Sequence, residues 1–165
     1  MNNITLIGMP GVGKSTVGVI LAKELGYDFI DSDLIIQKKT GRRLSAIIAR
    51  EGIDGFLRIE NDICSSIQVD KSVIATGGSV VYGKDAMEHL RSISRIVYLR
   101  LDVDTLSARL NNLKNRGVVI REGQTFDDLY NERCALYEKY ADYIVDESGK
   151  DIDATLLEVV KLFNE

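Results

Sequence analysis

The sequence has little of what marks secreted, membrane-spanning and nucleic-acid-binding proteins. Its two cysteines, Cys64 and Cys134, are too few for a disulfide framework, and their separation fits no zinc site. No apolar run approaches the roughly 20 residues of a membrane-spanning helix, and the first residues lack the pattern of a signal peptide. The 21 Lys and Arg are outnumbered by 25 Asp and Glu. We therefore expect a cytoplasmic protein that binds neither membranes nor nucleic acids, because polyanion-binding surfaces are basic.

The composition that remains is that of an ordinary globular domain. The chain has 165 residues, of which 45% are apolar and 28% charged, enough to bury one sizeable core. No internal repeat, low-complexity tract or linker divides it. We expect a single domain over residues 1–165.

Short apolar segments rich in β-branched residues alternate with segments of helical period, which is typical of βαβ units around a parallel sheet. The expected strands are residues 4–7, a short strand ending at Phe29-Ile30, and residues 72–76, 95–101 and 143–145. The expected helices are residues 15–25, 54–67, 84–91 and 102–113, and an amphipathic C-terminal helix. This order predicts an α/β fold, a three-layer α/β/α domain with a five-stranded parallel sheet. In such sheets ligands bind beyond the carboxyl ends of the strands.

The first strand and the first helix are joined by a phosphate-binding loop. Residues 8–15, Gly-Met-Pro-Gly-Val-Gly-Lys-Ser, fit the pattern G-x-x-x-x-G-K-S/T at every fixed position. The glycines let successive backbone N–H groups turn toward phosphate oxygens, and the helix N-terminus adds a partial positive charge. We expect Lys14 to contact the β- and γ-phosphates and the Ser15 hydroxyl to bind Mg²⁺. The loop predicts a P-loop nucleotide site.

Other features narrow the class of nucleotide-binding protein. An Asn-Lys-x-Asp guanine-recognition motif is absent, which argues against a GTPase, and motor or AAA-type ATPases are normally longer. A kinase that acts on a small molecule is the class that remains. Asp31 and Asp33 support it, because in an extended chain residues two apart point the same way. One carboxylate near Mg²⁺ and another near an acceptor hydroxyl suit phosphoryl transfer. The alternative is that both aspartates cap a helix that begins before Leu34.

A polar stretch over residues 111–125 is long for a connection in a compact domain. It contains several Asn, Arg and Gly residues and little apolar content beyond Val118-Val119-Ile120. Such a segment is typical of a lid that closes over an active site. The alternative is a solvated loop.

In combination, these features resemble the shikimate kinase family over essentially the whole chain. The resemblance extends beyond the phosphate loop to the aspartates after the second strand, a glycine pair and three arginines. The matching residues are 8–16, Phe29-Ile30-Asp31-Ser32-Asp33, Thr40-Gly41, Phe56, Glu60, Thr76-Gly77-Gly78, Arg109, Arg116, Arg133 and Leu136-Tyr137.

The resemblance implies a P-loop kinase fold with a mobile lid and a monomeric state. It also implies that ATP is the phosphoryl donor, that Mg²⁺ is the cofactor, and that the acceptor is a small anionic hydroxylated acid. It implies that Asp33 acts as the base and that Lys14 and the lid residue Arg116 stabilise the transferred phosphoryl group. Gly77 and Gly78 would approach the substrate with their backbone. The other implied contacts are Gly11, Val12, Gly13, Lys14, Ser15, Thr16, Arg109 and Arg116 for the nucleotide, Ser15 and Asp31 for magnesium, and Arg133 for the substrate carboxylate.

Three departures from the family pattern lie on the acceptor side. Leu57 stands where the family has an arginine that binds the substrate carboxylate, Ser79 stands at the third glycine of a Gly-Gly-Gly turn, and the segment after Arg116 lacks the usual proline. The neighbouring Arg58 is either a substitute contact to the substrate or a partner of Asp62 in an i,i+4 ion pair. One helical step turns it about 100° away from position 57.

We therefore predict an ATP-dependent kinase of a small hydroxylated molecule, with shikimate as the best single acceptor. Two alternatives remain open from the sequence. One is a related kinase of another hydroxy acid or polyol, such as the gluconate kinases. The other is a nucleotide-binding regulator that no longer transfers phosphate.

Overall fold

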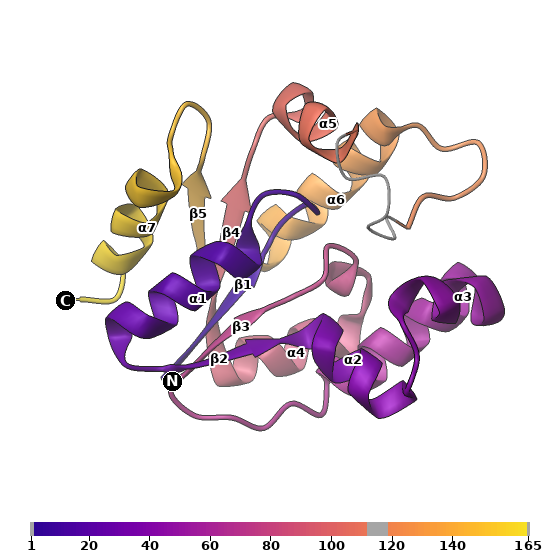
Figure 1. The fold of residues 1–165 in the computed structure, drawn as a ribbon, viewed down its shortest axis with the longest axis horizontal. Helices are drawn as coiled ribbons and strands as arrows, with labels where there is room; N and C mark the ends of the chain where they lie inside the picture. The colour runs from indigo at the N-terminus through magenta and orange to yellow at the C-terminus, as the bar shows by residue number, and fades with distance from the viewer. Residues whose placement is uncertain (1, 112–118, 165) are drawn as a thin grey trace.

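A computed structural model describes residues 2–111 and 119–164 of the chain. Its centre is a five-stranded parallel sheet with the strand order β2-β3-β1-β4-β5 (Figure 1). The strands are β1 (Asn3–Ile7), β2 (Asp28–Asp31), β3 (Ser72–Ala75), β4 (Ser94–Arg100) and β5 (Tyr143–Asp146). All five predicted strands are confirmed, within one or two residues at most ends. The apolar runs of the three inner strands, β3, β1 and β4, are largely buried on both faces, as parallel strands covered by helices require, whereas the edge strands β2 and β5 are partly exposed.

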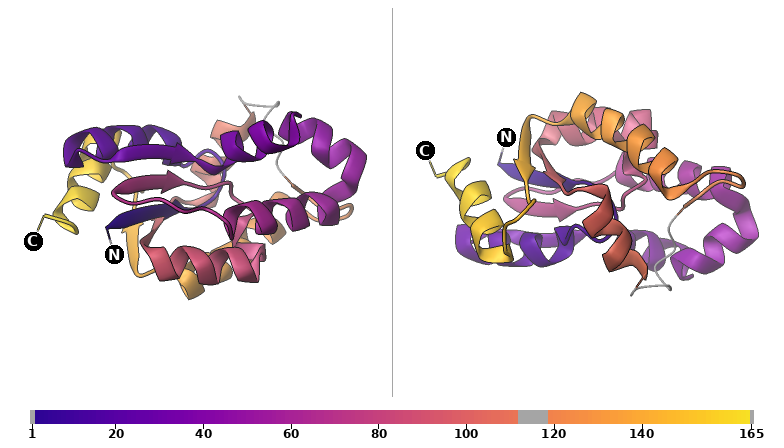
Figure 2. Two further views of the ribbon diagram at one scale, coloured as in Figure 1. Left: turned by 90° about the horizontal axis from the view of Figure 1, so that it is seen from below. Right: turned by 90° about the horizontal axis from the view of Figure 1, so that it is seen from above.

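Helices cover both faces of the sheet. They are α1 (Lys14–Leu25), α2 (Ser32–Thr40), α3 (Leu44–Cys64), α4 (Lys84–Ile93), α5 (Val103–Asn111), α6 (Phe126–Tyr140) and α7 (Ile152–Lys161), with a 3₁₀ turn η1 (Val80–Tyr82). Figure 2 shows α1 and α7 on one face and α4 and α6 on the other. The predicted three-layer α/β/α architecture is therefore confirmed.

The helix predicted over residues 54–67 is longer in the structure and begins earlier. It forms the second half of α3, which starts at Leu44 and ends at Cys64. A kink at Gly52, with φ 73°, divides the two halves, and the left-handed conformation there suits glycine. The helices α2 and α6 were not predicted. The end of the helix expected over 102–113, and residues 112–118 of the expected lid, lie outside the described residues.

The buried apolar side chains of the described residues form two clusters. The main core lies on both sides of the sheet and includes Leu6, Val17 and Val97. A smaller cluster lies beyond the carboxyl ends of the strands, where α2 and α3 extend outward (Figure 1), and consists of Ile36, Ile47, Phe56 and Val119. The second cluster supports one wall of the site described below.

Over residues 2–111 and 119–164, no helix combines the length and the apolar character that a membrane span needs.

Candidate active site

A cavity of about 510 Å³ lies at the carboxyl ends of β1, β2 and β3, where ligands bind in sheets of this kind. It is bounded by the phosphate loop, by the start of α2, by α3, and by the glycine turn after β3. The residues lining it include Gly11, Gly13, Lys14, Ser15, Thr16, Asp31, Asp33, Phe56, Gly77, Gly78, Ser79 and Arg133. The structure thus brings together most of the residues that the sequence predicted for the site.

The phosphate loop turns tightly between β1 and α1. Gly8 has φ 149°, and a Cβ atom there would lie 2.6 Å from the carbonyl oxygen of Leu99, so only glycine fits. Gly13, with φ 93°, is the N-cap of α1. The Lys14 ammonium group donates hydrogen bonds to the carbonyl oxygens of Gly8, at 2.7 Å, and Met9, at 2.9 Å. The loop therefore holds a cation at the N-terminus of a helix, which is a phosphate site.

Lys14 is almost fully buried, with 7% of its surface exposed. Burial lowers the pKa of its ammonium group to about 8. The negative charge of Asp33 partly opposes this effect, and the positive charge of Arg133 reinforces it. An anion entering the loop would favour the charged form. Lys14 is thus poised to meet phosphate oxygens.

Asp31 connects the phosphate loop to α2. Its Oδ2 accepts a hydrogen bond from the Ser15 hydroxyl at 3.2 Å, and its Oδ1 accepts from the backbone N–H groups of Asp33, at 2.9 Å, and Leu34, at 3.4 Å. Asp31 is therefore the N-cap of α2. The expectation of an extended chain through Asp33 was wrong, because the helix begins at Ser32. The capping alternative is correct for Asp31, which also contacts Ser15.

Asp33 lies in the first turn of α2 with its carboxylate facing the glycine turn after β3. Its Oδ1 lies 2.8 Å from the position that a Cβ atom on Gly77 would occupy. Burial, together with the negative charge of Asp31, raises the pKa of the Asp33 carboxyl to about 6, against the opposing effect of Lys14. A carboxylate with a raised pKa beside an open cavity can accept a proton from a bound hydroxyl group.

The glycine turn is closely packed from both sides. A Cβ atom on Gly78 would lie 2.7 Å from Cδ of Pro10 and 3.0 Å from Nη1 of Arg133. The Gly77 N–H group donates to the Ser32 hydroxyl at 3.3 Å. These contacts leave no room for a side chain at either glycine, so any ligand there meets the backbone.

Arg133 reaches the cavity from α6 and is 1% exposed. Its Nη2 donates to the carbonyl oxygen of Val119 at 3.1 Å, and its guanidinium lies 5.5 Å from the ring centroid of Tyr82. Within the described residues its Nε has no hydrogen-bond partner and no carboxylate forms an ion pair with it. A buried cation without a counterion is well suited to bind an anionic group of a ligand.

The sequence analysis gave no role to Glu60, which lies on α3 behind the glycine turn. It is 2% exposed, and its Oε1 accepts a hydrogen bond from the Ser79 hydroxyl at 2.7 Å. Burial raises the pKa of its carboxyl to about 7. Two signals could have indicated that Glu60 faces the site: it is one of the residues that match the family pattern, and it lies on the same helical face as Phe56.

Four predicted residues either do not line the cavity or lie outside the described residues. Val12 is buried in the main core instead. Arg58 is on the exposed side of α3 and does not line the cavity, because one helical step rotates it away from position 57. Its predicted ion pair with Asp62 is not among those of the described residues. Arg109 lies at the outer edge of the phosphate loop, where it donates to the Gly11 carbonyl oxygen at 2.9 Å. Arg116 lies outside the described residues.

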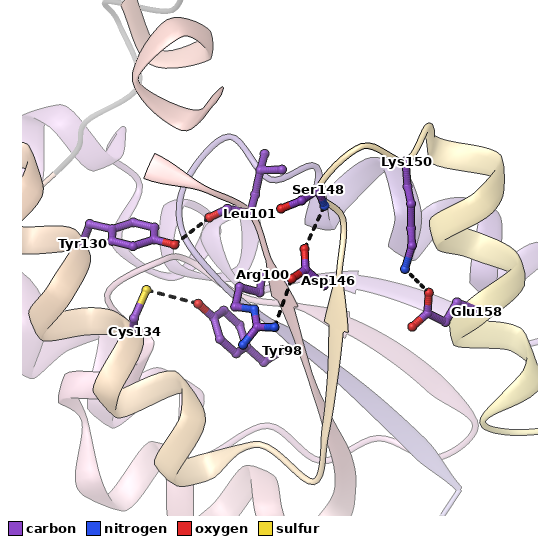
Figure 3. A network of polar contacts seen from close by, with 9 residues as sticks. All are labelled: Tyr98, Arg100, Leu101, Tyr130, Cys134, Asp146, Ser148, Lys150 and Glu158. Atoms are coloured by element: carbon purple, nitrogen blue, oxygen red, sulfur yellow. Dashed lines mark hydrogen bonds and ion pairs between the residues drawn. The ribbon is translucent and has the colours of Figure 1, made fainter. Parts of the chain in front are cut away.

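A polar network fixes the carboxyl ends of β4 and β5 beside the phosphate loop (Figure 3). Arg100 pairs with Asp146 at 3.0 Å, Asp146 accepts from the Ser148 N–H at 2.9 Å, and the Tyr130 hydroxyl donates to the Leu101 carbonyl oxygen at 2.8 Å. Glu147, whose backbone N–H donates to the Arg100 carbonyl oxygen at 2.8 Å, is a second buried carboxyl that the sequence analysis missed. Burial raises its pKa to about 7, although Arg109 and Lys14 oppose this.

Comparison with known proteins places this geometry in context. The family model described as shikimate kinase matches residues 10–164. A shikimate kinase from Thermodesulfovibrio yellowstonii is 37% identical, and the match covers 98% of this chain and 94% of the relative. A shikimate kinase from Alteromonas mediterranea is 38% identical, and the match covers 96% of this chain and 94% of the relative. Among solved structures, shikimate kinase from Acinetobacter baumannii in complex with shikimate superposes with a TM-score of 0.87. It is 32% identical and the match covers 98% of this chain and 92% of the other.

Proposed function

The chain belongs to the shikimate kinase family, and on that premise we propose that it transfers the γ-phosphoryl group of ATP to a hydroxyl group of shikimate, yielding shikimate 3-phosphate. One observation of the structure carries the proposal. A single cavity holds a phosphate loop, a carboxylate with a raised pKa, and a buried arginine without a counterion. The phosphate loop would bind the phosphoryl donor, the carboxylate would act as the base, and the arginine would bind an acidic acceptor.

Asp33 has the position of the general base in this proposal. As the acceptor oxygen attacks the γ-phosphorus, its proton passes to the Asp33 carboxylate, and the bond from the γ-phosphorus to the bridging oxygen of ADP breaks. Lys14 stabilises the negative charge that spreads over the phosphoryl oxygens. By the family resemblance we propose the same task for Arg116, and contact with the adenine for Arg109. The loop residues Gly11, Val12, Gly13, Ser15 and Thr16 would hold the phosphates.

The residues around Ser15 fit a magnesium ion. The hydroxyl oxygen of Ser15 lies 3.2 Å from a carboxylate oxygen of Asp31. Mg²⁺ prefers hard oxygen ligands of this kind, and water and phosphate oxygens would complete its coordination shell. When bound, the ion neutralises charge on the β- and γ-phosphates. We propose that Ser15 contacts it directly and that Asp31 orients Ser15.

The acceptor side supports an anionic substrate held mainly by Arg133, with the backbone of Gly77 and Gly78 against it. Leu57 favours a second candidate within the same class. Its side chain packs with the small apolar cluster and supplies no second cation, so the same machinery could serve a different hydroxy acid. Both cysteines are free. We propose a single-domain protein acting in the reducing cytoplasm and, by the family resemblance, a monomer.

The test is a coupled assay of ADP release with MgATP and millimolar shikimate, and a control without an acceptor. Turnover that depends on shikimate is the expected result. ADP release no greater than in the control would refute shikimate as the acceptor. A panel of hydroxy acids and sugars would then separate a related kinase from a regulator without transfer activity.

A further inference from the structure

Two buried side chains of opposite charge lie against the glycine turn without pairing. Glu60 is 2% exposed and Arg133 is 1% exposed. In the part of the chain that the structure describes, no ion pair joins them, and Oε2 of Glu60 and Nε of Arg133 have no hydrogen-bond partner. Buried opposite charges attract one another strongly, because little water screens them. Something must hold this pair apart.

Both groups lie close to the glycine turn. Oε2 of Glu60 lies 3.0 Å from the Cβ position of Gly77, and Nη1 of Arg133 lies 3.0 Å from the Cβ position of Gly78. Consecutive Cα atoms are about 3.8 Å apart. The two side chains thus approach neighbouring residues of the same turn. Arg133 is also near enough to act on the Glu60 carboxyl, because its positive charge lowers the pKa of that group.

Ser79 is the residue that holds Glu60 in its observed position. Its hydroxyl donates to Oε1 of Glu60 at 2.7 Å, and this is a buried contact between residues on different elements. Ser79 precedes η1, which is packed against α3 and α6, so its position is fixed. No other side chain makes a hydrogen bond to Glu60 among the described residues.

Leu57 makes this restraint necessary. It lies one helical turn before Glu60, is half-buried in the small apolar cluster, and offers no positive charge. Among the described residues, Arg133 is the one cation that lowers the pKa of Glu60, while Asp33 raises it. Ser79 and Arg133 are therefore the two groups that compete for the Glu60 carboxyl.

We infer that Ser79 is a positioning residue that keeps Glu60 away from Arg133 and so leaves the guanidinium free for the carboxylate of the acceptor. The inference rests on the proposed function, since it concerns how the acceptor is bound. Without the Ser79 hydroxyl, Glu60 pairs with Arg133 and competes with the acceptor. Binding of the acceptor then weakens, whereas the phosphate loop is unaffected.

The test compares the variants Ser79→Ala, Glu60→Gln and the double variant with the wild type. We expect Ser79→Ala to raise KM for shikimate roughly tenfold or more, the scale of one charge-assisted hydrogen bond, with kcat and KM for ATP changed less than about threefold. In the double variant the neutral amide no longer attracts Arg133 as a carboxylate does. Its KM for shikimate should return to within about threefold of that of Glu60→Gln alone.

A matched control is Ser94→Ala. Ser94 is also a buried serine, 1% exposed, and its hydroxyl donates to the Leu90 carbonyl oxygen at the opposite end of the sheet. We expect this variant to lower the thermal midpoint without raising KM for shikimate. If Ser79→Ala fails to fold, Ser79→Gly removes the same hydroxyl at a backbone conformation that glycine adopts freely.

Two results would overturn the inference while leaving the proposed function intact. One is an unchanged KM in Ser79→Ala and Ser79→Gly. The other is a raised KM that Glu60→Gln does not reverse, which would mean that Ser79 acts through shape alone. A wild-type enzyme without acceptor-dependent turnover would instead refute the proposed function, and with it this inference.

Discussion

Replacing Asp33 by asparagine should make the protein more stable and much less active. The ionised carboxylate of Asp33 is buried beside the negative charge of Asp31, and these two causes raise its pKa from the usual 3.8 to about 6. In the unfolded chain the carboxylate is solvated and neither cause operates. The folded state therefore holds this charge at a cost in free energy, and asparagine of the same shape removes the charge.

The size of the effect follows from the pKa shift. About two pKa units, at about 1.4 kcal/mol each, amount to about 3 kcal/mol in the free energy of unfolding. Because the folded pKa is raised, stability contributed by protonated Asp33 is complete below pH 4 and is lost as the pH rises to about 6. At pH 7.5 the full difference in the free energy of unfolding between the wild type and Asp33→Asn is therefore present. For a chain of this length it corresponds to roughly 6–12 °C in the thermal midpoint.

Thermal unfolding of the wild type and Asp33→Asn at pH 7.5 and pH 4 measures this difference. We expect a higher midpoint for the variant at pH 7.5, little difference at pH 4, and a kcat lower by about 10²–10⁴-fold, the range typical of a lost general base. Asp62→Asn, an exposed aspartate on α3, serves as the control and should change neither quantity. A variant that is equally stable at both pH values, or one with wild-type kcat, would refute the reasoning.

Four further outcomes follow from the same site. Activity as kcat/KM should rise as the pH increases through about 6, since Asp33 must be ionised to accept a proton; a rate that falls over that range in a pH–rate profile would contradict its role. Leu57→Arg should lower KM for shikimate by supplying a second cation, measured by steady-state kinetics, and an unchanged KM would count against shikimate as the natural acceptor. Arg133→Met should raise KM for shikimate roughly ten- to 150-fold, which is the effect of losing one charged hydrogen-bond partner. If calorimetry showed that ADP binding is weakened by the same factor, Arg133 would have no role specific to the acceptor. Removal of Mg²⁺ with a chelator should abolish turnover and its return should restore it, whereas turnover that persists would exclude the proposed ion at Ser15.

The features predicted well from the sequence are those encoded locally. The phosphate loop is a contiguous motif, and the strands are short apolar runs bounded by glycine or charged residues, so neither depends on distant contacts. The conformation of Asp33 was mispredicted because it depends on where α2 begins. The helix cap formed by Asp31 fixes the start of α2. The sequence around Asp31 and Asp33 alone does not distinguish a helix cap from an extended strand.

The acceptor side was harder to predict because its contacts join distant parts of the chain. The hydrogen bond from Ser79 to Glu60 spans 19 residues, and that from Arg133 to Val119 joins α6 to the segment before it. Helical rotation alone sufficed to suggest that Arg58 faces away from position 57. The same reasoning could not show that Glu60 lies behind the glycine turn, since that depends on how α3 packs against α2, α4 and η1.

The division of the apolar interior into two clusters has a consequence for how such an enzyme can change. Folding of the sheet depends on the main core, whereas the wall beside Leu57 depends on a cluster of four buried side chains in α2, α3 and the segment at Val119. Substitutions in that wall are energetically separate from those that hold the nucleotide loop in place. A lineage can therefore alter which acceptor it accepts, one residue at a time, while the machinery that handles ATP stays intact.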